Sequence, residues 1–270
     1  MPAPASADPF AAERRKAREP DPDVPAPSLP RLRGRLVARL RESVERHRDF
    51  VTVRREDLRW RIGAPGWADA ALGRGACSAT RLVRLEPGTA LPWADGAIAQ
   101  EALLLEGRLG GAAQRLERGS LVLRGSAGAE APHAGEGAAL MYVRDLLAAP
   151  PAAEAAWWQA AGPGLRTVAA GRRRWQAAFP GVQTLLLWGA GPVVSMLVRF
   201  APGAGVPDHR HAIDEDCLML EGEMFLGDIL LRAGDYQLAP AGGGHFGETS
   251  EAGGTFFFHG ALDAALAAGA

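Results

Sequence analysis

The sequence predicts an all-β protein made of two tandem barrels with a short N-terminal helix. The chain has 270 residues, 34 of them glycine and 20 proline, and 47% of its residues are hydrophobic. Many turn residues between short apolar segments are typical of strands joined by tight turns. A chain of this length corresponds to one or two domains. An internal repeat favours two domains.

The repeat appears when the sequence is shifted by 115 residues without a gap. Turn residues then fall on turn residues and apolar residues on apolar residues, which means that the same bends and strands recur. The superposed pairs are Arg59-Trp60 with Arg174-Trp175, Pro65-Gly66 with Pro180-Gly181, Leu82-Val83-Arg84 with Leu197-Val198-Arg199, Pro87-Gly88 with Pro202-Gly203, Pro92 with Pro207, Leu105-Glu106-Gly107 with Leu220-Glu221-Gly222, and Gly119 with Gly234.

The segments before the first barrel differ in character. Residues 1–30 alternate proline, alanine and charged residues, so we expect a disordered or extended tail. Apolar residues then recur at three- and four-residue spacing, which predicts an amphipathic helix of about four turns. They are Leu32, Leu36, Val37, Leu40 and Val44. We expect this helix to pack on a barrel or on a partner subunit, and a homodimer is compatible with the architecture.

The repeat sets the predicted domain boundaries. The first barrel with its leading helix occupies residues 31–147, beginning with a strand at residues 50–53, and the second barrel occupies residues 172–262. Residues 148–171 form an Ala- and Pro-rich linker, in which we expect Trp157-Trp158 to anchor against a domain. Residues 263–270 form a tail.

A four-residue set in the second barrel predicts a metal site. His209 and His211 are separated by one residue, so on a strand their side chains project to the same face. Glu215 and His245 complete a set of three imidazoles and one carboxylate. The chain has only six histidines, and three of them fall in this set. Such ligands suit Zn, Fe, Ni, Cu or Mn. Open coordination positions would allow catalysis, whereas a closed tetrahedral zinc would be structural.

The first barrel lacks these ligands. In the register of the repeat, the four positions are occupied by Ala94, Gly96, Gln100 and Glu130. Glu101 and His133 lie nearby, but they would need register changes that the turn residues do not support. We therefore expect a metal-free first barrel that is structural or that binds something without an ion.

The spacing of the ligands and turns resembles the two cupin motifs. The first runs Gly203-x5-His209-x-His211-x3-Glu215-x6-Gly222, and the second runs Gly234-x5-Pro240-x-Gly242-x2-His245. The second motif usually has Asn where this chain has Thr249. The resemblance implies a bicupin, with two double-stranded β-helix (jelly-roll) barrels.

A second set of residues narrows the resemblance. A helix, Phe-Val-x-Val at residues 50–53, Trp60, Pro65-Gly66 and Leu-x-Arg-Leu-x-Pro-Gly at residues 82–88 follow each other in this order. This order is similar to the cupin module of ChrR-type anti-sigma factors and their stand-alone relatives, over residues 30–262. The family implies binding of a divalent metal and, in full-length regulators, sensing of oxidative stress. Those regulators also carry a zinc-binding His-x3-Cys-x2-Cys motif. This chain has no Cys before Cys77, which argues against sigma factor binding.

Three functions remain open. The first is a stress- or small-molecule-responsive regulatory module that binds one divalent ion (Zn, Fe, Mn or Ni) and lacks the anti-sigma domain. The second is a non-heme metal-dependent dioxygenase of the β-diketone-cleaving type, because related bicupins include such enzymes. The third is a scaffold with a structural zinc. The sequence does not decide whether the protein is an enzyme, and catalytic residues are unknown.

Other residues near the motifs have two interpretations. Cys217 is expected inward beside the metal, as a small buried residue in preference to a ligand. Packing in the core is favoured over lining a ligand pocket for Phe246, Phe256, Phe258, Tyr236 and Met219. Glu248, Asp214 and His259 are available polar groups, but spacing does not bring them to the metal. Alternation puts His259 on the same side as Phe257.

Composition excludes several classes of partner. The formal net charge is −1, so no polyanion is expected, and the run at residues 172–174 of three arginines is expected in a solvated loop. Nucleic acid and membrane are therefore not expected partners, whereas a small-molecule ligand in the second barrel is. Two cysteines cannot form a disulfide framework and no secretory leader is visible, so a cytoplasmic location is expected.

Overall fold

The computed structural model describes residues 29–110 and 115–263. Most of the two predicted tails lies outside these ranges. The chain divides into two units, residues 1–48 and residues 49–270. In the first unit, helix α2 (Leu29–Arg46) confirms the predicted amphipathic helix and begins two residues before residue 31. Its packing partner stays a prediction. No helix in the described ranges is both long and apolar enough to cross a bilayer.

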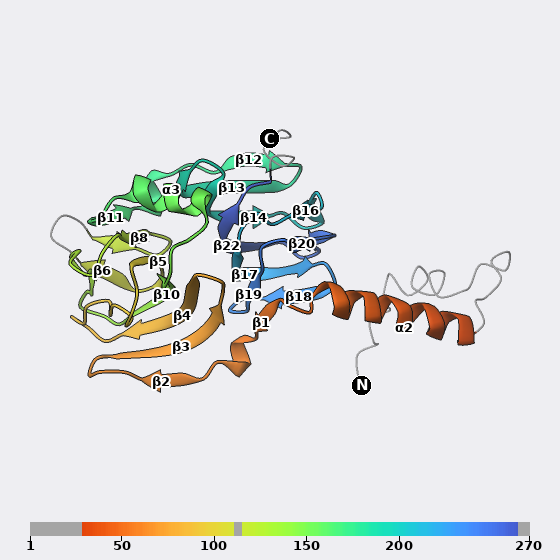
Figure 1. Cartoon of the computed structure of the whole chain (residues 1–270), viewed down its shortest axis with the longest axis horizontal. Helices are drawn as coiled ribbons and strands as arrows, with labels where there is room; N and C mark the ends of the chain where they lie inside the picture. The colour runs from red at the N-terminus through yellow and green to blue at the C-terminus, as the bar shows by residue number, and fades with distance from the viewer. Residues whose placement is uncertain (1–28, 111–114, 264–270) are drawn as a thin grey trace, which may run out of the picture. The chain divides into compact units, whose positions relative to one another are not determined.

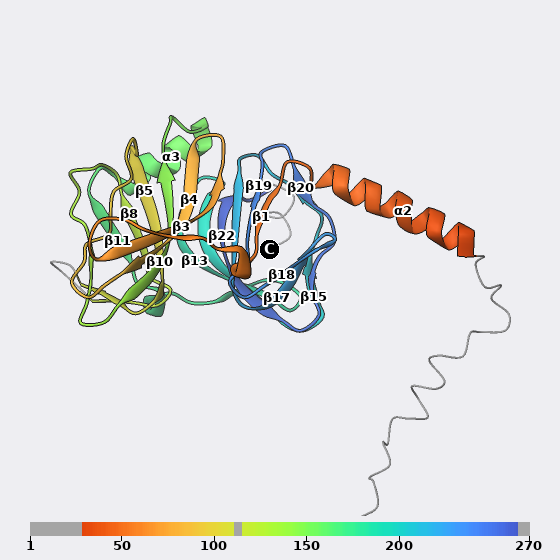
Figure 2. The same ribbon diagram turned by 90° about the horizontal axis from the view of Figure 1, so that it is seen from below.

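The second unit contains two barrels of antiparallel strands, shown side by side in Figures 1 and 2. The first barrel is built from β2 (Trp60–Ile62), β3 (Trp67–Arg74), β4 (Ser78–Leu85), β5 (Ala99–Glu106), β6 (Arg108–Gly110), β7 (Leu116–Glu117), β8 (Leu121–Arg124), β9 (His133–Ala134), β10 (Ala139–Leu146) and β11 (Leu165–Val168). Its larger sheet runs β11-β8-β5-β10-β4-β3-β2, and its smaller sheet runs β7-β6-β9.

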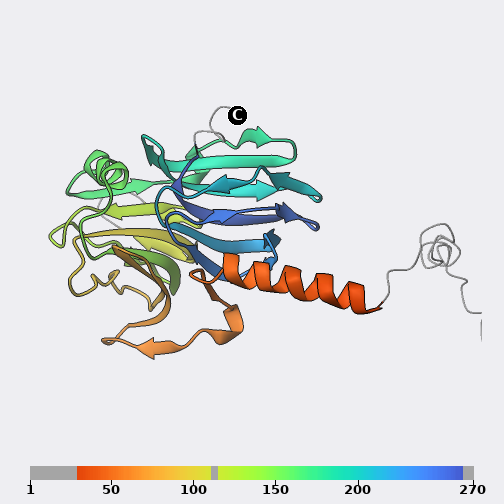
Figure 3. The ribbon, with the colours of Figure 1, turned by 45° about the vertical axis from the view of Figure 1, so that its right-hand side comes forward.

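The second barrel is built from β1 (Val51–Val53), β12 (Gln176–Phe179), β13 (Val182–Ala190), β14 (Val193–Phe200), β15 (Ala204–Val206), β16 (His209–Arg210), β17 (Glu215–Leu226), β18 (Ile229–Arg232), β19 (Tyr236–Ala239), β20 (Gly244–His245), β21 (Glu248–Ser250) and β22 (Gly254–Ala261). Its main sheet runs β1-β19-β17-β22-β14-β13-β12, and β16 pairs with β20. Figure 3 shows these strands stacked one above another. The predicted all-β class is confirmed.

The repeat recurs in the strand boundaries. A shift of 115 residues carries β4 onto β14, β8 onto β19, and β10 onto β22, with identical bounds in each case. The shift also carries β1 into β11. Matching turn residues had predicted this correspondence, and the structure bears it out strand by strand.

The two barrels exchange their first strands. β1 precedes the first barrel in sequence but pairs with β19 of the second, joining Val51 to Leu238. Its counterpart β11 lies in the predicted linker but pairs with β8 of the first barrel, joining Leu165 to Arg124. Strand pairing therefore crosses the boundaries drawn from the sequence, because the repeat predicts which segments are strands but not which sheet they join.

The linker also contains a helix that the sequence analysis did not predict. Helix α3 (Ala152–Ala161) follows Pro151 and ends at Gly162, whose positive φ suits the end of a helix. Alanine-rich sequence between proline and glycine is a usable helix signal. Trp157 is fully buried and Trp158 is 8% exposed, and both pack into the core that the barrels share. The predicted anchoring role of these tryptophans is confirmed.

The interface between the barrels has three layers. On each facing strand, alternate residues point toward the other barrel. A charged layer at one end contains Thr80, Glu101, Arg144, Ser195, Asp216 and His259, and the apolar middle layer contains Leu82, Leu103, Tyr142, Leu197, Leu218 and Phe257. The third layer, which lines an open groove, contains Arg84, Leu105, Leu140, Arg199, Leu220 and Thr255. In every layer, the first three residues are repeat equivalents of the last three.

Candidate metal centre

Two short strands position two of the three histidines. His209 in β16 is the direct cross-strand partner of His245 in β20. The strands can approach because Gly244 has no side chain: a Cβ there would lie 2.5 Å from the carbonyl oxygen of His209. The imidazole centroids of His209 and His245 are 5.5 Å apart.

The next turn and the start of β17 add the other two residues. The backbone of His211 donates to the Gly243 carbonyl and accepts from the Gly242 amide, which fixes it beside β20. Glu215 begins β17 and points into the barrel. Its Oε1 lies 3.1 Å from His245 Nε2, and its Oε2 lies 3.6 Å from His211 Nε2.

This arrangement fits a transition metal ion. One ligand atom each from His209, His211 and Glu215 lies within 4.8 Å of the others. All four predicted residues are buried, and neither ring nitrogen of His211 or of His245 makes a well-aligned hydrogen bond, although His245 Nε2 lies 3.1 Å from Glu215 Oε1. Buried polar atoms are nearly always satisfied, and neutral imidazoles with a carboxylate are donors that Zn, Fe, Mn or Ni accepts. The structure thus brings together the predicted ligands.

Electrostatics favour the metal-binding protonation states of two of these residues. Burial would raise the pKa of Glu215, but the neighbouring imidazoles, His245 first, outweigh burial and hold the pKa at about 2. Burial lowers the pKa of His211 to about 4, although Glu215 opposes this shift. At neutral pH, Glu215 is therefore a carboxylate and His211 is a neutral imidazole. These are the forms of the two side chains that coordinate a metal ion.

Contacts behind the rings hold two of them in place. His209 Nδ1 lies 3.1 Å from the carbonyl oxygen of Pro207, so this nitrogen donates and Nε2 is left for the site. Phe50, from the segment that leads into β1, packs its ring against His245 and His211 at centroid distances of 5.7 and 6.3 Å. The sequence analysis placed Phe50 in a strand of the first barrel and not at the metal site. The exchange of β1 between the barrels has no local signal in the sequence.

A cavity of about 150 Å³ is lined by two of the four residues, His209 and Glu215. His209, Glu215 and Glu248 are the ionisable groups facing it. Its remaining wall is formed by Ala178, Phe179, Val182, Thr184, Met196, Val198, Val206, Phe256, Phe258, Ala261 and Leu262. No lysine or arginine is among these described wall residues. The cavity therefore offers an apolar chamber with a polar end at the candidate ligands.

Comparison with known proteins agrees with this fold. Residues 164–263 match the family described as ChrR Cupin-like domain. The matched range contains all strands of the second barrel except β1, so this barrel resembles a ChrR cupin-like domain. None of the curated proteins matches the sequence significantly.

Solved structures extend the likeness to both barrels. A Nostoc punctiforme protein provisionally described as a dioxygenase has a TM-score of 0.63 at 14% identity, covering 80% of this chain and 84% of its own. Protein Ylba from E. coli has a TM-score of 0.60 at 15% identity, covering 80% and 92%. Lactobacillus farciminis oxalate decarboxylase has a TM-score of 0.56 at 14% identity, covering 79% and 86%. At these identities, the likeness establishes the cupin fold alone.

Two of the five suggested wall residues line the cavity of the cupin domain. Phe256 and Phe258 face it, whereas Tyr236 lies in the core between the barrels and Met219 in the core of the second barrel. Phe246 is partly exposed and packs against Arg210. The two phenylalanines of β22 also belong to the buried core of the second barrel, so the core interpretation is confirmed for them and they line the cavity as well.

Glu248 lies at the site, although its spacing in the sequence did not predict this position. Its Oε2 lies 4.0 Å from His209 Nε2, and the side chain is 7% exposed. Burial is the main cause of the raised pKa of this carboxyl group. Gly247 before it has a positive φ, and this turn directs β21 back past the imidazoles. A glycine between His245 and a carboxylate was the only available signal.

The other candidates have different roles. Cys217 lies inward beside Glu215, with 3.8 Å from Sγ to Oε1, and burial raises its thiol pKa well above the usual value. Asp214 accepts hydrogen bonds from the amides of Ala76 and Ala241 and so joins two loops. His259 lies between the barrels on the side of Phe257, as alternation predicted.

In the first barrel, the equivalent interior holds a hydrogen-bonded charge network. Gln100, the counterpart of Glu215, donates to Asp145 at 2.8 Å and accepts from Arg124 at 3.0 Å. Arg81 also donates to Asp145, at 2.8 Å. Two arginines and one aspartate therefore surround Gln100, at the position that corresponds to Glu215 in the second barrel.

Proposed function

We propose that the cupin domain binds one divalent transition metal ion through His209, His211, Glu215 and His245, and is a dioxygenase acting on a small molecule held in the adjoining cavity. A bound ion such as Fe(II) would supply Lewis acidity and a site for O2. The observation that carries this proposal is the continuity of the cavity with His209 and Glu215. A purely structural zinc would have its coordination closed by protein and would need no chamber beside it.

The cavity favours a small, uncharged and mostly apolar substrate. Its volume of about 150 Å³ is below the usual range for drug-sized ligands of roughly 300–1,000 Å³. An anionic substrate would meet Glu215 and Glu248 without a guanidinium or ammonium group in the described wall to balance it. Small β-diketones fit these conditions, whereas small aromatic acids do not.

Residues around the site have assignable tasks. The Pro207 carbonyl holds the His209 ring, and Phe50 shields His211 and His245 from water. Phe256 and Phe258 would contact the apolar part of the substrate. Glu248 would hydrogen-bond its polar end, because this carboxyl group faces the cavity at the end nearest His209.

Oxygen consumption tests the proposal. The full chain is loaded anaerobically with Fe(II) and offered β-diketones and small aromatic acids, and O2 uptake is followed. We expect uptake with at least one diketone and its loss in Glu215→Ala. Gln100→Ala, at the equivalent position of the first barrel, is the matched control and should retain turnover. No uptake across the panel by metal-loaded protein contradicts a dioxygenase.

A conservative change separates substrate binding from metal binding. Glu248→Gln keeps the size of the side chain but alters its hydrogen bonding. We expect unchanged iron content and kcat/KM lowered about tenfold, since one such bond is worth about 1.4 kcal/mol. Loss of iron in this variant would instead identify Glu248 as a ligand.

A regulatory module is the second candidate, favoured by the match to the ChrR cupin-like family. In this case the same ion and cavity would bind a stress-related small molecule without turnover. Metal-loaded protein that binds a diketone in calorimetry but consumes no O2 would support it. Recovery of a sigma factor in a pull-down would extend it to the partner that the sequence argues against.

A further inference from the structure

The charged layer of the interface lies directly behind the candidate metal centre. Glu215 and Asp216 are neighbours on β17, so Glu215 points into the cupin domain and Asp216 points toward the first barrel. On the adjacent strand β22, His259 is the cross-strand partner of Asp216. The following residue, Gly260, lies against Glu215, where a Cβ would be 3.1 Å from Glu215 Cγ.

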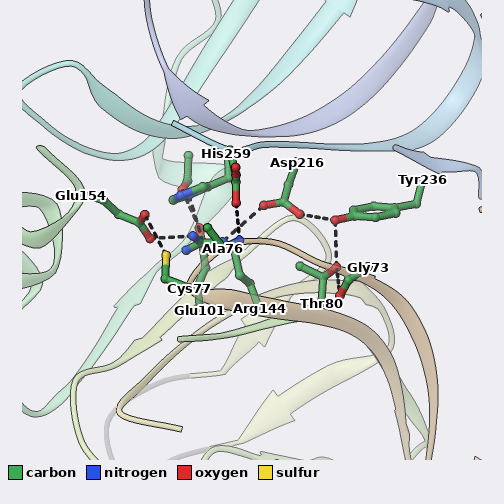
Figure 4. Close-up of polar contacts among 12 residues, drawn as sticks. Gly73, Ala76, Cys77, Thr80, Glu101, Arg144, Glu154, Asp216, Tyr236 and His259 are labelled. Carbon is green, nitrogen blue, oxygen red and sulfur yellow. Dashed lines mark hydrogen bonds and ion pairs between the residues drawn. The ribbon is translucent and has the colours of Figure 1, made fainter. Parts of the chain in front are cut away.

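Two acid–base pairs join the first barrel to Asp216 and His259, as Figure 4 shows. Arg144 Nε lies 3.3 Å from Asp216 Oδ2, and Glu101 Oε2 lies 3.1 Å from His259 Nδ1. Glu101 and Asp216 are repeat equivalents, as are Arg144 and His259. Each acid therefore pairs with the base of the other barrel.

Further bonds fix both pairs. Ser195 donates to Glu101, and Tyr236 donates to Asp216 while accepting from Thr80 across the interface. Glu154 from α3 pairs with Arg144 from the opposite side. The side chains of this layer that carry acidic or basic groups all belong to residues between 0 and 2% exposed.

Because these pairs are buried, they restrict the positions of the residues that they join. A buried ion pair tolerates little displacement, because moving one partner away leaves the other charged and desolvated. β17 and β22 are thus held at Asp216 and His259, one residue away from Glu215 and from the glycine that makes room for it. Simple burial of apolar surface would hold the barrels together without fixing these two positions.

From this we infer that the first barrel positions the metal centre: Arg144 and Glu101, acting through Asp216 and His259, set Glu215 against the three imidazoles. They are positioning residues, since neither faces the cavity. The inference rests on the proposed metal binding and assigns the first barrel a function that needs no ion of its own. Removing Arg144 or Glu101 should therefore change the geometry and affinity of a site in the other barrel.

Cobalt binding to the full chain tests the inference. Co(II) is titrated into wild type, Arg144→Met, Arg144→Lys and Glu101→Gln, and the dissociation constant and visible ligand-field spectrum are recorded. We expect Arg144→Met to bind at least tenfold more weakly with a changed spectrum, and Glu101→Gln to show a smaller change in the same direction. Arg144→Lys, which keeps the cation, should stay within about threefold of wild type.

A matched control separates positioning from stability. Val122→Ala removes methyl groups from the first barrel's own core, away from the interface, and should lower the melting temperature without changing the cobalt spectrum. If Arg144→Met does not fold, Glu101→Gln carries the test. Wild-type affinity and spectrum in folded Arg144→Met or Glu101→Gln overturn the inference while leaving the proposed function intact. Wild type that binds no cobalt overturns both.

Discussion

The two barrels share one strand plan but fill their interiors in opposite ways. At the position of Glu215 the first barrel has Gln100, and at the position of Gly260 it has Asp145, which binds Gln100 and Arg81. Met196 lines the cavity of the second barrel, and its counterpart Arg81 spans the interior of the first. Where the second barrel has the candidate ligands and a cavity, the first barrel therefore has an internal ion pair. A barrel interior with a buried carboxylate needs a compensating cation, supplied by arginine in one barrel and proposed as a metal in the other.

The largest expected effect is on metal content. His211→Ala removes one of four ligands from a buried site, so the purified protein should fall from about one ion per chain to well below half. Gln100→Ala changes the equivalent centre of the first barrel and should leave the content unchanged. Elemental analysis of protein purified without chelator measures both. A content near two ions in wild type would contradict the assignment of a metal-free first barrel.

The second comparison concerns stability. Asp145→Ala leaves Arg81 without its closest carboxylate and Gln100 with only the Pro92 carbonyl as an acceptor, inside a barrel where both are buried. Breaking such a buried network costs about 3–5 kcal/mol. Urea denaturation should show this loss in the free energy of unfolding. A change below about 1 kcal/mol would mean that water or Asp69 replaces the lost charge.

A reciprocal substitution tests the space around Glu215. Gly260→Ala introduces a methyl group 2.8 Å from Phe258 Cζ and 3.1 Å from Glu215 Cγ. Either side chain must shift, and we expect metal affinity to fall about tenfold, equivalent to about 1.4 kcal/mol. Calorimetric titration with zinc measures it. Ala139→Gly, a small-residue exchange at a distant buried site in the first barrel, should leave affinity unchanged.

The smallest effect depends on pH. Burial would raise the pKa of Glu101, but His259 and Arg144 outweigh it and the pKa is lowered. A lowered folded-state pKa gives stability that is present above the unfolded value of about 4.3 and is lost as pH falls through the folded value. Wild type should therefore lose its advantage over Glu101→Gln as the pH falls below the unfolded-state value of about 4.3. Unfolding free energies at several pH values measure this, and a constant difference would contradict the assigned pairing.

The sequence predicted the fold, which is confirmed, and four candidate ligands that the structure brings together, because both leave local signals. Turn glycines and prolines recur at one spacing, and His209 and His211 share a strand face by alternation. The exchange of β1 and β11 could not be read in this way, because strand partners are set by long-range pairing. The role of Phe50 followed from that exchange and was missed with it. Helix α3 was missed although Pro151, the alanines and Gly162 were available as signals.

The charged interface shows a further limit. Alternation put His259 beside Phe257, and the repeat made Arg144 its counterpart, but neither pattern shows that each pairs with an acid of the other barrel. Glu101 entered the sequence analysis only as a rejected ligand. Its contact with His259 depends on how the two barrels pack, which no local pattern encodes.

Anomalous X-ray diffraction from crystals of metal-loaded protein would show whether the four residues bind one ion. We expect one peak per chain, about 2.0–2.2 Å from Nε2 of His209, His211 and His245 and from a carboxylate oxygen of Glu215. A peak beside Cys217 at a sulfur distance of about 2.3 Å, or one among Gln100, Arg124 and Asp145 of the first barrel, would contradict it.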